Sequence, residues 1–171
     1  MPPLSSSVRC RMTFHVLAAL LLATSLPASA LSQECTFDQK AVASELQHMA
    51  RRHPGYRIVT GGSAVEWVHR GGYTVRLSYG GCEDLGAEVL VRGEKGKPGP
   101  GMQELIAAVS RYWSPAQARD LESALASGKL TRVVDGDTTF LEASGSVSSA
   151  FPLGFTIVLS KHEVSLSWPV A

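Results

Sequence analysis

The stretch from Gly93 to Gly101 divides the sequence into two parts and limits how the chain can fold. It contains four glycines and two prolines in nine residues. Such a composition favours neither a helix nor a strand, because proline lacks a backbone N–H and glycine adds backbone freedom. One helical stretch and several alternating runs precede this segment, whereas two helical stretches and further alternating runs follow it. We therefore expect a surface loop here, inside an α+β domain.

Three stretches have the apolar spacing of three to four residues that is typical of a helix. The clearest helix start is Ser114-Pro115, where serine can cap the helix and proline occupies its first turn. Gln117 would complete a capping box, and Gly128 is a typical left-handed helix end. The helices are expected at residues 36–52, 102–113 and 115–128.

Alternating apolar and polar residues predict the strands, and Tyr73–Tyr79 is the clearest example. Arg70-Gly71-Gly72 and Asp135-Gly136-Asp137 are typical hairpin turns, so neighbouring strands are expected to run antiparallel. The predicted fold is α+β, with a mostly antiparallel sheet, three helices packed on one face and one disulfide. The strands are expected at residues 56–60, 64–69, 73–79, 87–92, 131–134, 138–142, 155–159 and 164–168.

The first thirty residues have the pattern of a secretory signal peptide. Arg9 and Arg11 precede an apolar run over residues 14–26, and Ala28-Ser29-Ala30 supplies the small residues of a cleavage site. A membrane anchor is the alternative, but this run is shorter than the roughly 20 residues that cross a bilayer. We therefore expect a single globular domain at residues 31–171, not membrane-spanning, in the periplasm or outside the cell. The excess of arginine over lysine suggests a bacterial source.

Two cysteines would remain after cleavage, because Cys10 leaves with the signal peptide. In an oxidising compartment Cys35 and Cys82 are expected to form a disulfide. The bridge would close a loop of about 48 residues, which the chain-entropy model values at about 4 kcal/mol. A catalytic cysteine is the alternative, but an exported thiol beside a second thiol tends to oxidise.

Charge and motifs exclude several classes of function. Without Arg9 and Arg11 the chain has 14 basic and 15 acidic residues, so it lacks the excess positive charge that nucleic-acid binding needs. The sequence contains no standard catalytic, phosphate-binding or dinucleotide-binding motif, and no cofactor is expected. His48 and His53 are five residues apart on different sides of a helix, which predicts no metal site.

The segment Tyr79-Gly80-Gly81-Cys82-Glu83-Asp84 is the candidate binding loop. Two glycines let the backbone turn sharply after a strand, the disulfide would fix the turn, and Glu83 and Asp84 would project from it. A rigid acidic loop loses little entropy when it binds a basic partner. The alternative is structural, with the glycines only allowing the helix and the strand to approach for the bridge.

The leading hypothesis is an exported protein that acts by binding another protein rather than by catalysis. In size, compartment and lack of catalytic motifs, it is similar to small periplasmic inhibitors and immunity proteins, although no specific motif carries that resemblance. A small hydrolase that uses Glu66, Glu83 or Asp84 is the second hypothesis, because carboxylate pairs serve glycoside hydrolysis. A structural module of the cell envelope is the third.

Mass spectrometry of the exported protein tests the predicted signal-peptide cleavage and the predicted disulfide together. We expect the mature N-terminus at residue 31 and a mass two hydrogen atoms below that of the reduced chain, because Cys35 and Cys82 would be oxidised to a disulfide. An intact N-terminus with both thiols free to react would contradict this prediction.

Overall fold

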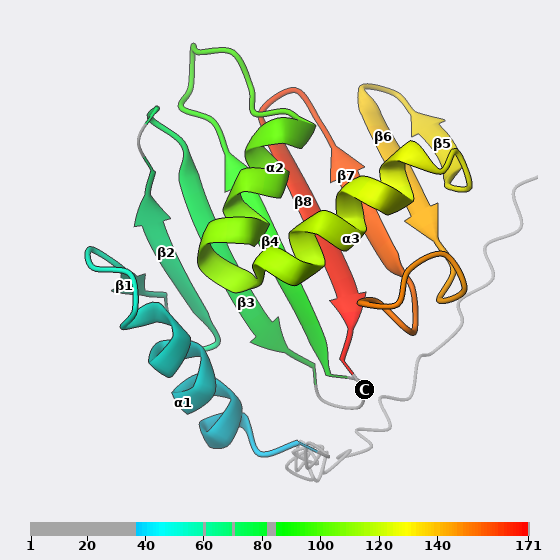
Figure 1. Ribbon diagram of the computed structural model, residues 1–171. Coiled ribbons are helices and arrows are strands. Elements are labelled where there is room, and N and C mark those ends of the chain that lie inside the picture. The colour runs from blue at the N-terminus through cyan, green and yellow to red at the C-terminus, as the bar shows by residue number, and fades with distance from the viewer. Residues whose placement is uncertain (1–36, 60, 70, 82–84, 171) are drawn as a thin grey trace, which may run out of the picture. The chain divides into compact units, whose positions relative to one another are not determined.

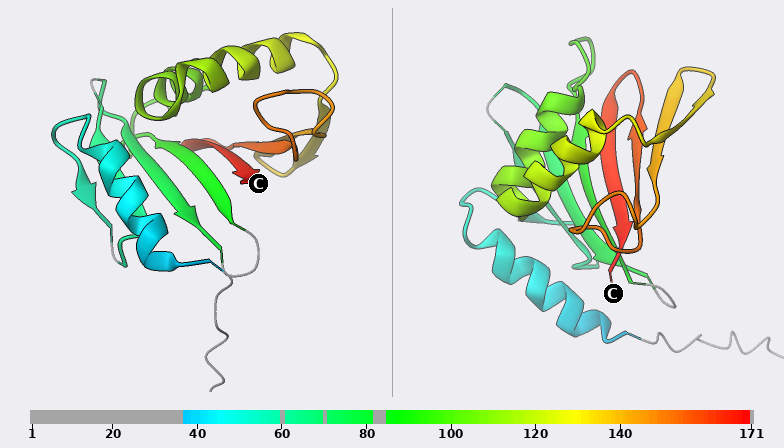
Figure 2. Two further views of the ribbon diagram at one scale, coloured as in Figure 1. Left: turned by 60° about the horizontal axis from the view of Figure 1, so that its bottom comes forward. Right: turned by 45° about the vertical axis from the view of Figure 1, so that its right-hand side comes forward.

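The computed structural model describes residues 37–170 except 60, 70 and 82–84. The described residues form one eight-stranded antiparallel sheet, three α-helices and a short π-helix, which confirms the predicted α+β class. All three α-helices lie on the same side of the sheet (Figures 1 and 2). The strands are β1 (Arg57–Ile58), β2 (Ala64–Val68), β3 (Thr74–Gly80), β4 (Gly86–Arg92), β5 (Thr131–Asp135), β6 (Thr138–Ala143), β7 (Phe155–Leu159) and β8 (Glu163–Pro169). The helices are α1 (Gln39–Ala50), α2 (Met102–Ala108), the π-helix η1 (Val109–Trp113) and α3 (Pro115–Ala126).

The sheet is built from two meanders that meet at its centre. Its strand order is β1-β2-β3-β4-β8-β7-β6-β5, so each half runs from an edge inwards and the last strands of the two halves pair with each other. Helix α1 precedes the first meander and packs on β2 and β3, whereas α2, η1 and α3 connect the two meanders. Because the loop at residues 93–101 follows β4, the chain leaves the sheet there and returns at the opposite edge, at β5.

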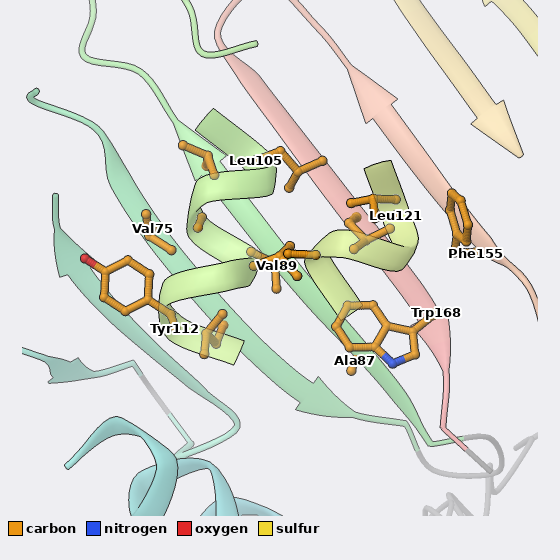
Figure 3. Packing of buried hydrophobic residues seen from close by; sticks show 14 of the residues in the cluster. Val75, Ala87, Val89, Leu105, Tyr112, Leu121, Phe155 and Trp168 are labelled. Carbon is orange, nitrogen blue, oxygen red and sulfur yellow. The ribbon is translucent and has the colours of Figure 1, made fainter. Parts of the chain in front are cut away.

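The core lies between the sheet and the helices, as the alternation of the strands predicts. Trp67, Val75, Val91 and Val164 form one row across four adjacent strands, and all four are at most 4% exposed. The helices cover this face with leucines that are fully buried, and Figure 3 shows part of this packing. The helix side chains at the centre of the core are Leu46, Leu105, Val109 and Leu121.

The π-helix η1 explains how two successive aromatic residues both reach the sheet. In an α-helix neighbouring side chains point about 100° apart, but the wider turn of η1 relaxes this constraint. The Ser114 N–H donates to the Val109 carbonyl at 2.8 Å, five residues back. Trp113 is thereby stacked on Tyr79 and packed edge-on against Trp168, while Tyr112 stacks on Trp67. In Figure 3 the Tyr112 ring extends from the helix towards the β2 side of the sheet.

The helix ends confirm most of the predicted capping. Ser114 accepts a hydrogen bond from the Gln117 N–H at 3.3 Å, and Pro115 begins α3. Gly128 has a φ of 68°, the left-handed conformation that favours glycine at a helix end. The predicted capping box is wrong in one respect, because the Gln117 side chain donates to the Ala150 carbonyl instead of its own helix start.

Asp120 ties the loop between β6 and β7 to α3. The Ser148 hydroxyl and the Ala150 N–H, the latter at 3.0 Å, both donate to its carboxylate. These hydrogen bonds stabilise the charged form, so the pKa of Asp120 is held below its ordinary value of 3.8. Ser148 is itself buried, and Phe151 from the same loop is fully buried in the core. The carboxylate therefore holds in place a segment that closes one end of the core.

The structure does not support the predicted disulfide, because Cys35 and Cys82 both lie outside the described residues. The predicted signal peptide at residues 1–30 lies outside them as well. The Gln39 side-chain amide donates to the Gly81 carbonyl at 2.8 Å. This contact joins α1 to the connection after β3, the two segments that the predicted bridge would also join. The bridge stays a prediction.

We expect Asp120→Asn to lower the free energy of unfolding at pH 7 by about 1 to 2 kcal/mol, because hydrogen bonds to a charged acceptor are worth more than those to a neutral one. Denaturant unfolding measures the difference. Since the pKa of Asp120 is lowered in the folded state, its contribution is present above pH 3.8 and is lost as the pH falls further.

The matched control is Glu122→Gln, which also removes an acidic side chain from α3 but at an exposed position without a hydrogen bond among the described residues. The stability difference between Asp120→Asn and the native chain should shrink at pH 3, and a difference that stays constant with pH would contradict the assigned role.

Candidate functional site

Half of the predicted binding loop can be placed in the structure. Tyr79 is half-buried, because its ring stacks on Trp113 with centroids 5.7 Å apart. Gly80 ends β3 opposite Gly86, and Gly81 has a φ of 136° that strongly favours glycine. Glu83 and Asp84, the two acids on which recognition would depend, lie outside the described residues. The binding role of this loop therefore stays a prediction, and Tyr79 contributes packing to the core.

Glu66, the third carboxylate of the hydrolase hypothesis, is engaged in an ion pair. The guanidinium of Arg57 donates two hydrogen bonds to one of its oxygens, at 2.9 Å from Nε and 2.5 Å from Nη2. The two residues are also opposite each other in the β1–β2 ladder. The carboxylate is 12% exposed, whereas the arginine is 77% exposed. This arrangement explains how a nearly buried acid is tolerated on the sheet.

The sheet face opposite the helices carries an apolar stripe that the sequence reading missed. Ladder pairing places Leu90, Ser165, Val158, Phe140 and Val133 in one row, from β4 through β8, β7 and β6 to β5. Leu90 is 8% exposed at the centre of the sheet, and exposure rises to 47% at Val133 on the edge. No helix of the described chain covers this face (Figure 2). We call this row the β5 stripe.

Strand β5 is the edge at which this stripe ends. All five of its residues are exposed, and they include Val133 and Val134, at 47% and 59%. The two-residue turn Gly136-Asp137 places Asp135 opposite Thr138, and Gly136 has the positive φ that such a turn requires. Since hydrogen-bonded pairs alternate along an antiparallel ladder, the N–H and C=O groups of Arg132 and Val134 point away from β6. Among the described residues none pairs with this side of β5.

A second feature that the sequence reading missed is a cluster of histidines and aromatic rings beside η1. Tyr112 stacks on Trp67 with centroids 4.7 Å apart, and the edge of His53 packs against it at 5.2 Å. The Tyr112 hydroxyl lies 2.9 Å from Nδ1 of His69, and the Trp67 indole N–H donates to the His53 carbonyl at 2.9 Å. The cluster joins the end of α1, the end of β2 and η1 in one rigid contact.

Burial and positive charge act together on His53. Burial, followed by the nearby charges of Arg111 and Arg52, lowers its pKa below the ordinary value of 6.5. The imidazole is therefore neutral at pH 7, because each of these effects disfavours its protonated form. The one signal for this site in the sequence is the Tyr112-Trp113 pair in a predicted helix. Nothing in the spacing of the histidines indicates that His53 and His69 both contact Tyr112.

Searches for similar proteins give no guide to function: no protein family, curated protein or solved structure matches the chain. In the part of the chain that the structure describes, no three histidine, cysteine or acidic residues gather as metal ligands. Nor is any helix of this part long and apolar enough to cross a membrane. The assignment of function therefore rests on the geometry of the β5 edge and of the aromatic cluster.

We expect acidification to destabilise the protein through His53. A histidine whose pKa is lowered by folding contributes stability above its unfolded pKa of about 6.5, and this contribution is lost as the pH falls towards the folded value. Thermal unfolding of the native chain should therefore shift to lower temperature between pH 7 and pH 5, and the shift should be smaller for His53→Gln.

His48→Gln is the control, because His48 lies on the exposed side of α1 near the same helix end. If both variants retain the full pH dependence of the native chain, His53 is not the titrating group.

Proposed function

We propose that this chain is an exported protein that acts by binding another protein, and that it adds an extended segment of its partner to the sheet at β5. The single observation that carries the proposal is that all five residues of this edge strand are exposed, including Val133 and Val134, which are both about half exposed. An edge of this kind is a template for pairing with another chain, and natural proteins otherwise protect such edges.

The two edge strands of the sheet differ in how much backbone they offer for pairing with another chain. Strand β1 has only two residues, and a strand this short offers little backbone for pairing. Strand β5 has five residues and presents the N–H and C=O groups of Arg132 and Val134, enough for a short added strand. The two edges differ in length, which supports one docking edge rather than two.

The side chains beside this edge indicate what kind of segment would fit. On the helix-free face Val133 lies opposite Phe140, which lies opposite Val158. Apolar side chains of an added strand would therefore extend the β5 stripe. On the other face Arg132 and Val134 offer a cation beside an apolar group. The partner segment is therefore extended and alternating, with apolar residues on one side and at least one acidic residue on the other.

An inhibitor- or immunity-like role is the finer form of this proposal. The β5–β6 hairpin is held in the sheet along β7, so its edge loses little conformational freedom on binding. A pre-ordered edge that captures a strand or flap of an enzyme can block that enzyme without any catalytic group of its own.

The two other hypotheses have weaker support. A hydrolase would need a second carboxylate near Glu66, yet Glu66 is paired with Arg57, and Glu83 and Asp84 lie outside the described residues. A structural envelope module would use β5 to pair with a second copy of the same chain. That outcome is distinguished by the experiment below, because the captured product would then be a homodimer.

A photo-crosslinking residue placed at Val133 tests the proposal in the native host. We expect it to capture another protein, and a second substitution, Val134→Pro, to abolish the capture. Proline removes the outward N–H and blocks the edge, but it leaves the β5–β6 ladder intact because that N–H does not point to β6. Mass spectrometry identifies the captured segment.

The matched control carries the crosslinker at Val68, which is 82% exposed on β2, away from the β5 edge. Equal capture at both positions, capture that survives Val134→Pro, or a product made of two copies of this chain would contradict the proposal. Circular dichroism confirms that the proline variant is folded.

A further inference from the structure

The surface beside the aromatic cluster contains a pocket of about 360 Å³. Three elements form it: the chain after α1, the end of β2 and η1. His53 and Tyr112 contribute rings to its wall, and these are the same rings that pack on Trp67 in the cluster. Among the described residues, the charged or titratable side chains that line it are Arg52, His53, His69, Arg111 and Tyr112.

The charged and titratable groups of this pocket are all basic apart from one tyrosine. Arg52 comes from the end of α1 and Arg111 from η1, and the two histidines lie between them. No aspartate or glutamate is among the described residues that line the pocket. Within the described residues neither arginine forms an ion pair, whereas Arg57 and Arg92 each have a glutamate partner. Two arginines therefore line one pocket and both act on His53, with no acidic group among the described lining residues to balance their charge.

Packing contacts hold one wall of the pocket in place. The guanidinium of Arg111 lies over the Tyr112 ring, with 5.6 Å between its central carbon and the ring centroid. Tyr112 is fixed by its stack on Trp67 and by the contact of its hydroxyl with His69. A pocket wall held by packing in this way keeps its donors in place before a ligand arrives, so ordering this wall costs little entropy on binding.

We propose that this pocket binds a small tetrahedral oxyanion, such as the phosphate group of a phosphate monoester. Arg52, Arg111 and His53 all line this pocket, and together they offer several N–H donors to an anion that carries several oxygens. Guanidinium groups bind phosphate through charged, paired hydrogen bonds. The inference concerns a surface separate from the β5 edge, so it stands or fails independently of the proposed protein partner.

Binding should depend on pH through His53. The charged and titratable groups that face it are Arg52 from α1, His69 from β2, and Arg111 and Tyr112 from η1. Burial, followed by the charges of Arg111 and Arg52, lowers the pKa of His53, and a bound anion would oppose the effect of the arginines. Protonated His53 would add a third positive charge, so the anion is expected to bind more tightly as the pH falls below about 6.5.

Calorimetric titration with sodium sulfate at constant ionic strength tests the proposal. Sulfate is a tetrahedral dianion throughout the range from pH 5.5 to 7.5, so any pH dependence of its affinity reports on the protein. We expect Arg52→Gln and Arg111→Gln each to weaken binding by about tenfold or more, because each removes a charged donor. Inorganic phosphate should compete with sulfate, and sulfate should bind more tightly at pH 5.5 than at pH 7.5.

Arg51→Gln is the matched control. Arg51 precedes Arg52, is exposed, and does not line the pocket, so its loss should change the affinity by less than about twofold, as expected for a screened surface charge. His53→Gln should remove most of the pH dependence while the arginines still bind the anion. All variants alter exposed or partly exposed side chains, and thermal unfolding confirms that they are folded.

Three results would overturn the proposal. The first would be that the native chain shows no saturable heat with sulfate or phosphate. The second would be that Arg51→Gln weakens binding as much as Arg52→Gln, which would indicate diffuse charge attraction. The third is that acetate binds and sulfate does not, which would assign the pocket to planar carboxylates instead.

Discussion

The antiparallel pairing of β4 with β8 is the contact on which the rest of the molecule depends. It joins two meanders that each end at the centre of the sheet, over seven residue pairs from Gly86–Pro169 to Arg92–Glu163. The core residues on either side of this seam, Val89 and Leu166, are fully buried beneath the helices. Without the seam neither half would have a complete apolar face to cover, because α2 packs on both β4 and β8.

The π-helix η1 links this core to the surface chemistry. Its wide turn allows Tyr112 to stack on Trp67 within the core while the neighbouring Trp113, which is partly buried, packs against Trp168. Tyr112 in turn holds His69, and Arg111 beside it faces the basic pocket. One irregular turn therefore serves both the packing of the sheet and the placement of the groups that we propose bind an anion. Irregular helical turns of this kind are frequent at functional sites.

The elements were more predictable than the sites. Period-two alternation and the turn at Gly136 located the strands because both depend on local geometry, and Ser114 located a helix start for the same reason. The β5 stripe and the cluster of His53 with Tyr112 were not predicted. Both arise when residues from distant parts of the chain become neighbours through strand order and helix packing. The spacing of residues along the sequence does not indicate such contacts.

The central seam has a consequence for how the chain reaches this fold. At the Arg92–Glu163 contact the paired strands are separated by 71 residues, so the seam forms only after a long loop closes. This pairing is the one distant strand pair among the described residues, because the other six join strands that are consecutive in the sequence. It is expected to form late, because closing so long a loop costs conformational entropy before any contact of the seam is made. During that interval the inner edges of both meanders are unpaired. A chain that folds after crossing a membrane would therefore depend on folding helpers in its new compartment to avoid aggregation.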